Sequence, residues 1–217
     1  MIPVLNAAAE LPRTLAVLSE CGAIGDIVVV DGGSSDGSST IARTAGTRVI
    51  ETSPGRGAQL AVGAAAAAED WLLFIHADCR PRPGWESAVR AFVAAGPAAA
   101  GYFDLALDDA SPAARRLERL VRWRCRKLAL PYGDQGLLIH RTLYDAVGGY
   151  PPVPLMEDVA IVRRLGRARL RPLGATMLAS ARRYRRDGYL RRSLRNLLCL
   201  ALYFAGMSPA RIAKIYE

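Results

Sequence analysis

The chain has 217 residues, of which 51% are hydrophobic and 23% are charged. This composition is typical of a globular protein and excludes a mainly disordered chain. A chain of this length forms one domain by default and buries about 70% of its unfolded surface, so it needs no disulfide or metal to fold. Its formal net charge of +9 suggests a polyanionic partner such as nucleic acid, anionic lipid or a phosphorylated substrate.

The positive charge is concentrated in the last quarter of the sequence. Residues 1–159 carry 15 Lys and Arg against 18 Asp and Glu, a net charge of −3, whereas residues 160–217 carry 14 against 2, a net charge of +12. This distribution disfavours a nucleic-acid binder coated with positive charge. It favours a catalytic body with a basic tail.

The cysteines are widely spaced and form no CxxC pair, so the sequence indicates neither a zinc site nor a disulfide framework. We therefore expect reduced thiols and a cytoplasmic protein. The N-terminus lacks the features of a signal peptide. The longest apolar run near the C-terminus, residues 197–207, has 11 residues, whereas about 20 are needed to span a bilayer.

Strands and helices alternate over the first 100 residues, as hydrophobic runs and helical spacing predict. This alternation indicates an α/β fold with a mostly parallel central sheet flanked by helices. In chain order we expect a strand at 2–5, a helix at 7–21, a strand at 27–30, a helix after Gly37 to about Ala45, a strand at 48–51, a helix after Gly57 to about Glu69 and a strand at 71–75.

The pattern is looser after residue 100. We expect a strand at 102–107, a basic amphipathic helix at 112–130, a strand at 136–140, a helix at 156–165, a helix at 189–204 and a short helix that opens near Pro209.

Polar residues follow several of the predicted strands, where open α/β sheets bind their ligands. Asp31 comes after a buried apolar run, so its carboxylate can accept hydrogen bonds from a base N–H or a ribose hydroxyl. Gly33 lets the backbone turn beside it. The alternative is that Asp31 and Ser34 only cap the next helix.

Two further strand ends carry residues suited to a diphosphate and its metal. Arg56 lies between two glycines at the start of a predicted helix, which favours a diphosphate, although an ordinary turn has the same pattern. His76 and Asp78 are two positions apart, so their side chains can converge on Mg²⁺ or Mn²⁺. The alternative is a buried histidine and a helix-capping aspartate.

The adjacent acids Glu157 and Asp158 precede an apolar helical run. As first-turn residues they are favoured by the helix dipole. The functional interpretation is that one of them is a general base for an incoming nucleophile.

Five motifs occur in an order that resembles the inverting family 2 glycosyltransferases with the GT-A fold. They are Ile2-Pro3-Val4-Leu5-Asn6, Val30-Asp31-Gly32-Gly33-Ser34-Ser35-Asp36-Gly37, Pro54-Gly55-Arg56-Gly57, His76-Ala77-Asp78 and Glu157-Asp158. With Tyr132-Gly133-Asp134-Gln135-Gly136 and neighbouring phrases, the chain resembles a small bacterial subgroup over essentially its whole length. The resemblance implies a GT-A-like domain at 1–181, with a nucleotide-binding half at 1–100 and an acceptor half at 101–181, before a basic amphipathic helical tail at 182–217.

The resemblance also implies roles for individual residues. Asp31 would contact the nucleotide base, and Arg56 would lie near the base or the diphosphate. Asp78 would hold a divalent metal, Mn²⁺ or Mg²⁺, with His76 as a second ligand or a ribose contact, and Asp158 would be the catalytic base. The remaining expected pocket residues are Pro3, Asn6, Gly33 and Ser34.

Two positions depart from the family pattern. Ala7 stands where the family usually has glutamate after the first motif, and His76 replaces the first acid of the metal motif. The expected activity is metal-assisted transfer of a sugar from a nucleotide-diphosphate sugar, with UDP as the expected nucleotide, to a hydroxyl acceptor with inversion. The alternatives are a catalytically silent nucleotide-sugar or lipid-binding module and, ranked lower, a sugar nucleotidyltransferase.

The basic segment has two interpretations. Cations at 182–195 followed by an apolar run to residue 207 suit an anionic membrane surface or a lipid-linked acceptor, and the helix at 112–130 could join that surface. Alternatively, the apolar helix packs on the core or on a second subunit. The expected partners are therefore a nucleotide sugar, a lipid-linked or small-molecule acceptor, and an anionic membrane or a second copy, with no nucleic acid. The expected location is the cytoplasm or the inner face of the cell membrane.

Overall fold

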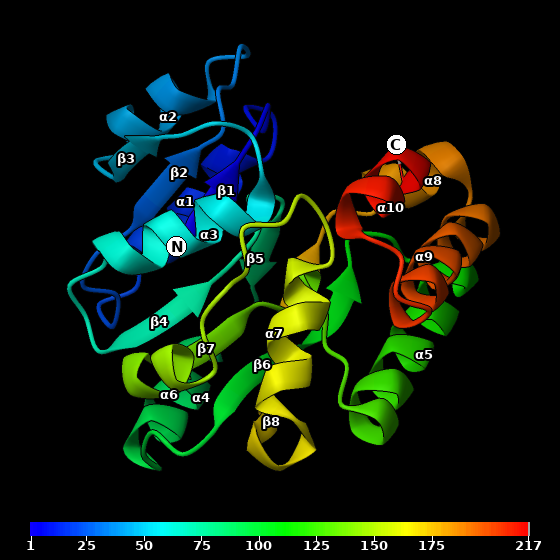
Figure 1. The fold of residues 1–217 in the computed structure, drawn as a ribbon. Helices are drawn as coiled ribbons and strands as arrows, with labels where there is room; N and C mark the ends of the chain where they lie inside the picture. Colours follow the sequence, from blue (N-terminus) through cyan, green and yellow to red (C-terminus); the bar gives the residue numbers. More distant parts are fainter. Residues whose placement is uncertain (217) are drawn as a thin grey trace.

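Two β-sheets that meet edge to edge form the centre of the computed structural model, which describes residues 1–216 (Figure 1). The first sheet has the order β1 (Ile2–Val4), β2 (Val28–Asp31), β3 (Arg48–Glu51), and all its strands are parallel. The main chains of Met1 and Leu73 join the sheets, because the Met1 amino group donates to the Leu73 carbonyl at 2.9 Å. The predicted α/β class and the parallel N-terminal strands are thus present.

The second sheet is mixed. Its order is β4 (Trp71–Phe74), β7 (Leu137–His140), β6 (Ala100–Leu107), β8 (Leu170–Ala179), β5 (Cys79–Pro81). Only β6 and β8 pair in parallel within this sheet, and the other three pairs are antiparallel. Parallel pairing, expected for most of the sheet, therefore covers the first three strands and the β6–β8 pair.

Helices cover both faces of the sheets, and the helices expected from the sequence are present with shifted ends. The helical elements are α1 (Leu11–Ser19), α2 (Ser38–Thr44), α3 (Arg56–Ala66), α4 (Trp85–Ala94), α5 (Pro112–Leu128), the 3₁₀ turn η1 (Gly133–Gln135), α6 (Arg141–Ala146), α7 (Glu157–Leu165), the 3₁₀ turn η2 (Arg167–Arg169), α8 (Arg182–Asp187), α9 (Tyr189–Phe204) and α10 (Pro209–Tyr216).

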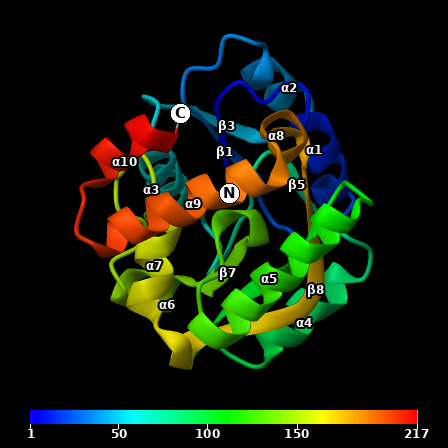
Figure 2. The same ribbon diagram turned by 90° about the vertical axis from the view of Figure 1, so that its right-hand side faces the viewer.

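The C-terminal helices, drawn in orange and red, fold back on the molecule: α10 lies near the start of α7, and α8 packs on α9 (Figure 1). A second small core joins α7 to α9 and α10, with Met156, Val159, Cys199 and Ile212 among its buried members. The segment predicted as a tail after residue 181 therefore packs against the start of α7. Figure 2 shows α5 and α9 lying side by side on one surface of the molecule.

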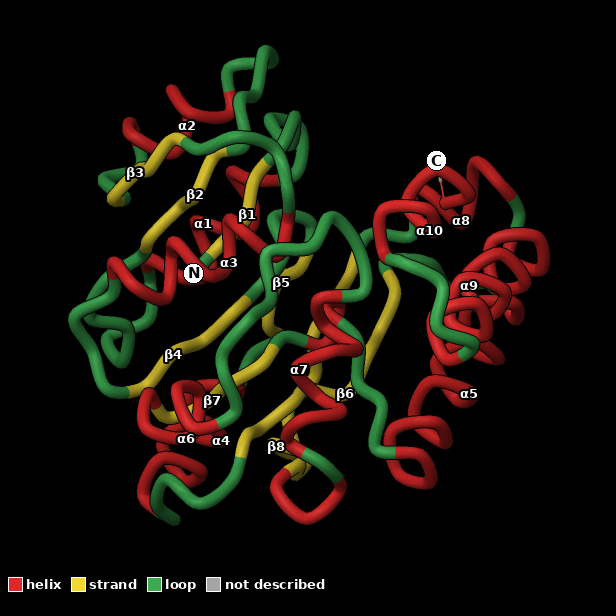
Figure 3. Tube along the Cα trace, in the orientation of Figure 1, coloured by secondary structure: helices red, strands yellow, loops and turns green. Residues whose placement is uncertain are grey.

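The loop at 147–156 connects α6 to α7 and passes the start of α3 (Figure 3). The Gly57 N–H donates to the Val153 carbonyl at 3.2 Å, and a Cβ on Gly57 would overlap the carbonyl oxygens of Pro151 and Val153. Glycine at position 57 thus lets this loop contact the helix. Among the described residues, no helix is long and apolar enough to cross a membrane.

Candidate functional site

The loops after β1 and β2 are held together by short polar side chains. The Asn6 N–H donates to Ser34 Oγ at 2.9 Å, and the Ser35 N–H donates to Asn6 Oδ1 at 2.9 Å. Asn6 has a φ of 51°, a left-handed conformation that asparagine tolerates better than most residues. The structure therefore brings together the first and second motifs, including Pro3, whose register partner is Val30.

Asp31 lies at the centre of this loop pair. Its carboxylate accepts hydrogen bonds from the Ser34 N–H and hydroxyl and from the Ser39 hydroxyl at 2.7 Å. The residue is only 2% exposed, whereas Gly33 beside it is exposed and has a φ of 89°. The carboxylate therefore organises its own loop and contacts a hydroxyl in the first turn of α2, although α2 begins at Gly37 without a side-chain capping hydrogen bond. Gly33 forms the open surface of that loop.

Gln59 fixes the ends of the first two strands and was not singled out from the sequence. Its side-chain amide donates to the carbonyls of Val4 and Val30, both at 2.8 Å, and the residue is buried. It lies one turn after Arg56 on α3, so the same helix supports both the loop pair and the arginine.

Arg56 at the start of α3 reaches the start of α7. Its guanidinium Nη1 lies 3.3 Å from Glu157 Oε1, and the side chains are 31% and 1% exposed, respectively. Burial opposes ionisation of both groups. Their mutual attraction nevertheless raises the pKa of Arg56, whereas burial, with the charge of Asp158, keeps the pKa of Glu157 above its usual value. Glu157 Oε2 is buried without a hydrogen-bond partner among the described residues.

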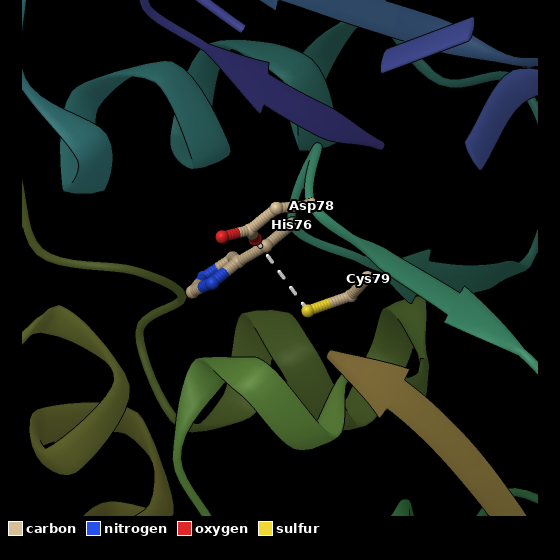
Figure 4. Close-up of side chains that lie close together, drawn as sticks. All are labelled: His76, Asp78 and Cys79. Atoms are coloured by element: carbon tan, nitrogen blue, oxygen red, sulfur yellow. Dashed lines mark hydrogen bonds between the residues drawn. The ribbon is translucent and has the colours of Figure 1, made fainter. Parts of the chain in front are cut away.

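His76, Asp78 and Cys79 lie together after β4, where the chain turns into β5 (Figure 4). One potential ligand atom from each residue lies within 4.8 Å of the others. Figure 4 shows the side chains of His76 and Asp78 pointing to the same side, with Cys79 Sγ facing an Asp78 oxygen; that pair is 3.6 Å apart. A nitrogen and a carboxylate this close fit a divalent cation such as Mn²⁺ or Mg²⁺. Burial raises the pKa of the Cys79 thiol well above its usual value, which makes it a poor ligand for such ions.

Asp134 in η1 pairs with the histidine of this group. Its Oδ1 lies 3.3 Å from His76 Nδ1, and its side chain is half exposed. Partial desolvation opposes ionisation of Asp134, but the hydrogen bond and charge of His76, with the charge of Arg56, lower its pKa to about 2. Gly133, which directly precedes Asp134, leaves room for the imidazole, because a Cβ there would overlap the His76 ring. The motif Tyr132–Gly136 was noted in the sequence, but its contact with His76 was not.

Asp158 occupies the first turn of α7, after a strained residue. Met156 caps the helix with a φ of 68°, a conformation that side chains rarely adopt. Asp158 Oδ2 accepts a hydrogen bond from the Gly133 N–H at 2.9 Å, and Oδ1 accepts one from the Val159 N–H at 2.7 Å. The carboxylate thus ties η1 to α7 while its side chain stays partly exposed.

One cavity of about 80 Å³ connects three of the predicted site residues. It is lined by Arg56, His76 and Asp158, together with Asp134 and residues of α9 and α10 that the sequence did not indicate: Asn196, Cys199, Leu200 and Tyr216. Asp78 is not part of the cavity wall, but one of its carboxylate oxygens lies within 4.8 Å of a ring nitrogen of His76. Asp31, Asn6 and Ser34 are not part of the cavity wall and form the separate loop cluster at the ends of β1 and β2.

Comparison with known proteins agrees with these motifs. The family model described as Glycosyl transferase family 2 matches residues 1–149. No curated protein matches the chain.

Several solved structures share the fold. Glucosyl-3-phosphoglycerate synthase from Mycobacterium tuberculosis, solved with Mn²⁺ and UDP-glucose, is 20% identical with a TM-score of 0.59, over 82% of this chain and 67% of that one. The same enzyme with Mn²⁺, UDP-glucose and phosphoglyceric acid is 21% identical with a TM-score of 0.58, over 91% of this chain and 76% of that one. A structure described only as a mycobacterial protein is 21% identical with a TM-score of 0.59 over 82% of this chain, which spans 63% of that protein's length. This likeness confirms the GT-A-like α/β fold predicted from the sequence.

Proposed function

Because the chain belongs to glycosyl transferase family 2, we propose that it transfers a sugar from a UDP-sugar to a hydroxyl acceptor, with inversion at the anomeric carbon. The observation that carries this proposal is the cavity lined by Arg56, His76 and Asp158. It combines a cation for a diphosphate, a metal-site histidine and a carboxylate that can accept a proton. The choice of UDP is supported by the UDP-glucose bound in structures that share the fold.

The nucleotide would bind at the loop cluster formed by Pro3, Asn6, Asp31, Gly33 and Ser34. A carboxylate can accept about four hydrogen bonds, and Asp31 already receives one from each of three groups of Ser34 and Ser39. The Ser34 N–H contacts both carboxylate oxygens, so a base N–H would compete with it for an acceptor position.

Arg56 would hold the donor diphosphate at the start of α3. There its positive charge adds to that of the helix N-terminus, and the side chain stays 31% exposed despite its contact with Glu157. His76 and Asp78 would hold Mn²⁺ or Mg²⁺, which would neutralise charge on the departing diphosphate when bound. Asp134 would orient the His76 ring, in the way that carboxylates orient metal-binding histidines.

Asp158 would be the general base for the acceptor hydroxyl. In the step we propose, the acceptor oxygen bonds to the anomeric carbon, the bond from that carbon to the diphosphate oxygen breaks, and the acceptor proton moves to Asp158. A single displacement from the side opposite the leaving group inverts the configuration. The N–H groups of Gly133 and Val159 hold the carboxylate in place for this role.

As partners we propose the donor nucleotide sugar, a hydroxyl acceptor that is either a small molecule or lipid-linked, and an anionic membrane surface contacted by residues 182–207. The phosphoglyceric acid bound to a structure of the same fold supports a small-molecule acceptor.

The Asp158→Asn variant tests the proposed base. Transfer from UDP-sugars should fall by about 100- to 10,000-fold, because a general base contributes about that much. UDP affinity measured by calorimetry with Mn²⁺ should stay within a few-fold of the parent. Asp145→Asn, at an exposed acid on α6, is the matched control and should keep full activity. Full turnover in the Asp158→Asn variant would remove Asp158 as the base.

A further inference from the structure

The outer face of α9 is an uninterrupted apolar stripe. Leu190, Leu194, Leu197 and Phe204 recur at helical spacing along it, and their exposed fractions are 74%, 56%, 61% and 48%. Ala201, also exposed, completes the stripe. Water-exposed apolar side chains aligned on one helix face are unusual unless a partner covers them.

Helix α5 extends this apolar surface. It lies beside α9 (Figure 2) and exposes Leu120 and Trp123, which are 64% and 56% exposed. Leu198 of α9 is also half exposed. We define the α5–α9 face by its exposed apolar side chains: Leu120, Trp123, Leu190, Leu194, Leu197, Leu198 and Phe204.

Arginines border the α5–α9 face, and acids are scarce there. Helix α5 carries seven cations against one acid, Glu118, which is buried and paired with Arg115. Helix α9 carries three arginines and no acid. Arg116, Arg119 and Arg191 are exposed and form no ion pair within residues 1–216. The border is therefore uncompensated positive charge.

We propose that the α5–α9 face docks on the surface of an anionic lipid bilayer. Apolar side chains that include a tryptophan suit the boundary between headgroups and acyl chains, and the bordering arginines suit anionic headgroups. A second copy of the chain fits less well, because a two-fold interface through this face would bring the same unpaired arginines of both copies together. This inference extends the membrane contact proposed for residues 182–207, because it specifies which side of α9 faces the bilayer and which side chains of α5 join it.

The opposite side of α9 belongs to the candidate site. Asn196, Cys199 and Leu200 line the cavity that contains Arg56 and Asp158. Docking through the outer stripe would therefore place the cavity about one helix diameter, roughly 10 Å, from the bilayer surface. An acceptor hydroxyl carried on a lipid headgroup could then reach the cavity; this step rests on the proposed transferase function, whereas the docking itself does not.

Sedimentation of the full chain with lipid vesicles tests the proposal. The parent should bind vesicles of phosphatidylglycerol and phosphatidylcholine at low salt and should not bind phosphatidylcholine alone. Leu197→Glu should weaken this binding at least about tenfold, and Arg116→Gln/Arg119→Gln about fivefold for each cation removed. Val62→Glu, at an exposed apolar residue of α3 away from this face, is the matched control and should bind like the parent.

Melting temperatures and UDP affinity of all variants should match those of the parent, so that a loss of vesicle binding is separated from misfolding and from failure of the donor site. Absence of parent binding to anionic vesicles at low salt would overturn the proposal. Equal binding of parent and Leu197→Glu would overturn it as well. A dimeric parent that Leu197→Glu converts to a monomer would assign the face to a second copy instead.

Discussion

The Arg56→Met substitution would leave the carboxylate of Glu157 buried without its guanidinium partner. Glu157 Oε1 lies 3.3 Å from Arg56 Nη1, Oε2 has no hydrogen-bond partner within the described chain, and the side chain is 1% exposed. Breaking a fully buried pair costs about 3–5 kcal/mol. Here Arg56 is partly exposed and Glu157 can take up a proton, so we expect a loss of about 2–3 kcal/mol. For a chain of this size, that loss corresponds to a fall in Tm of about 4–12 °C.

The loss should depend on pH in a defined direction. Burial raises the pKa of Glu157 in the folded protein above its value in the unfolded chain, despite the opposing charge of Arg56. Stability contributed by such a group is complete below the unfolded pKa and is lost as pH rises through the folded pKa. Removing Arg56 raises the folded pKa further. Relative to the parent, Arg56→Met should therefore lose more stability at pH 8 than at pH 5.

Thermal and urea unfolding at pH 5 and pH 8 would measure both effects. Adding Glu157→Gln to Arg56→Met removes the ionising group and should restore much of the stability at pH 8. Arg43→Met is the matched control, because the Arg43–Glu51 pair is exposed and should contribute at most about 1 kcal/mol. An equal loss at both pH values, with no recovery in the double variant, would show that Arg56 stabilises the fold by packing alone.

Three other substitutions test separate parts of the site. Asp78→Ala should weaken Mn²⁺-dependent UDP binding by more than about tenfold, because replacing even a residue that only hydrogen-bonds to a metal ligand lowers metal affinity by about that factor. Unchanged affinity by calorimetry would refute a role in metal binding. Gln59→Met keeps the side-chain volume but leaves the Val4 and Val30 carbonyls without their donor, so urea unfolding should show a loss of about 1–3 kcal/mol. Gly57→Ala would push α3 from the loop at 147–156 and should destabilise the protein by about 1–3 kcal/mol; a Tm equal to that of the parent would mean that the loop moves freely.

Strand β8 shows why part of the fold was not predictable from the sequence. It pairs with β5 and β6, yet it contains Pro172 and Gly174, residues that normally argue against a central strand. The irregular register of β6 between Tyr102 and Asp104 accommodates this segment. Pairing partners on both sides stabilise a strand that its own residues do not favour.

The sequence by itself determined the features that neighbouring residues encode. A β-branched apolar run followed by Asp31 specifies a buried strand with a polar end, and the glycines around Arg56 specify the start of a helix. Family motifs at these ends were enough to predict the α/β fold and the family. These signals are short-ranged, because the repeat of a strand or helix is read within a few residues.

Only the tertiary structure decided which distant groups share the site. Arg56 and Glu157 are 101 positions apart, and their contact depends on where the loop at 147–156 crosses α3. The pairing of His76 with Asp134 depends on how the chain between β4 and β7 folds back, and the position of α9 depends on the core it shares with α7. Such contacts arise from the packing of whole elements, which no local pattern specifies. The cavity wall therefore became visible only in the folded chain, as did the position of α9 between the cavity and the exposed apolar stripe.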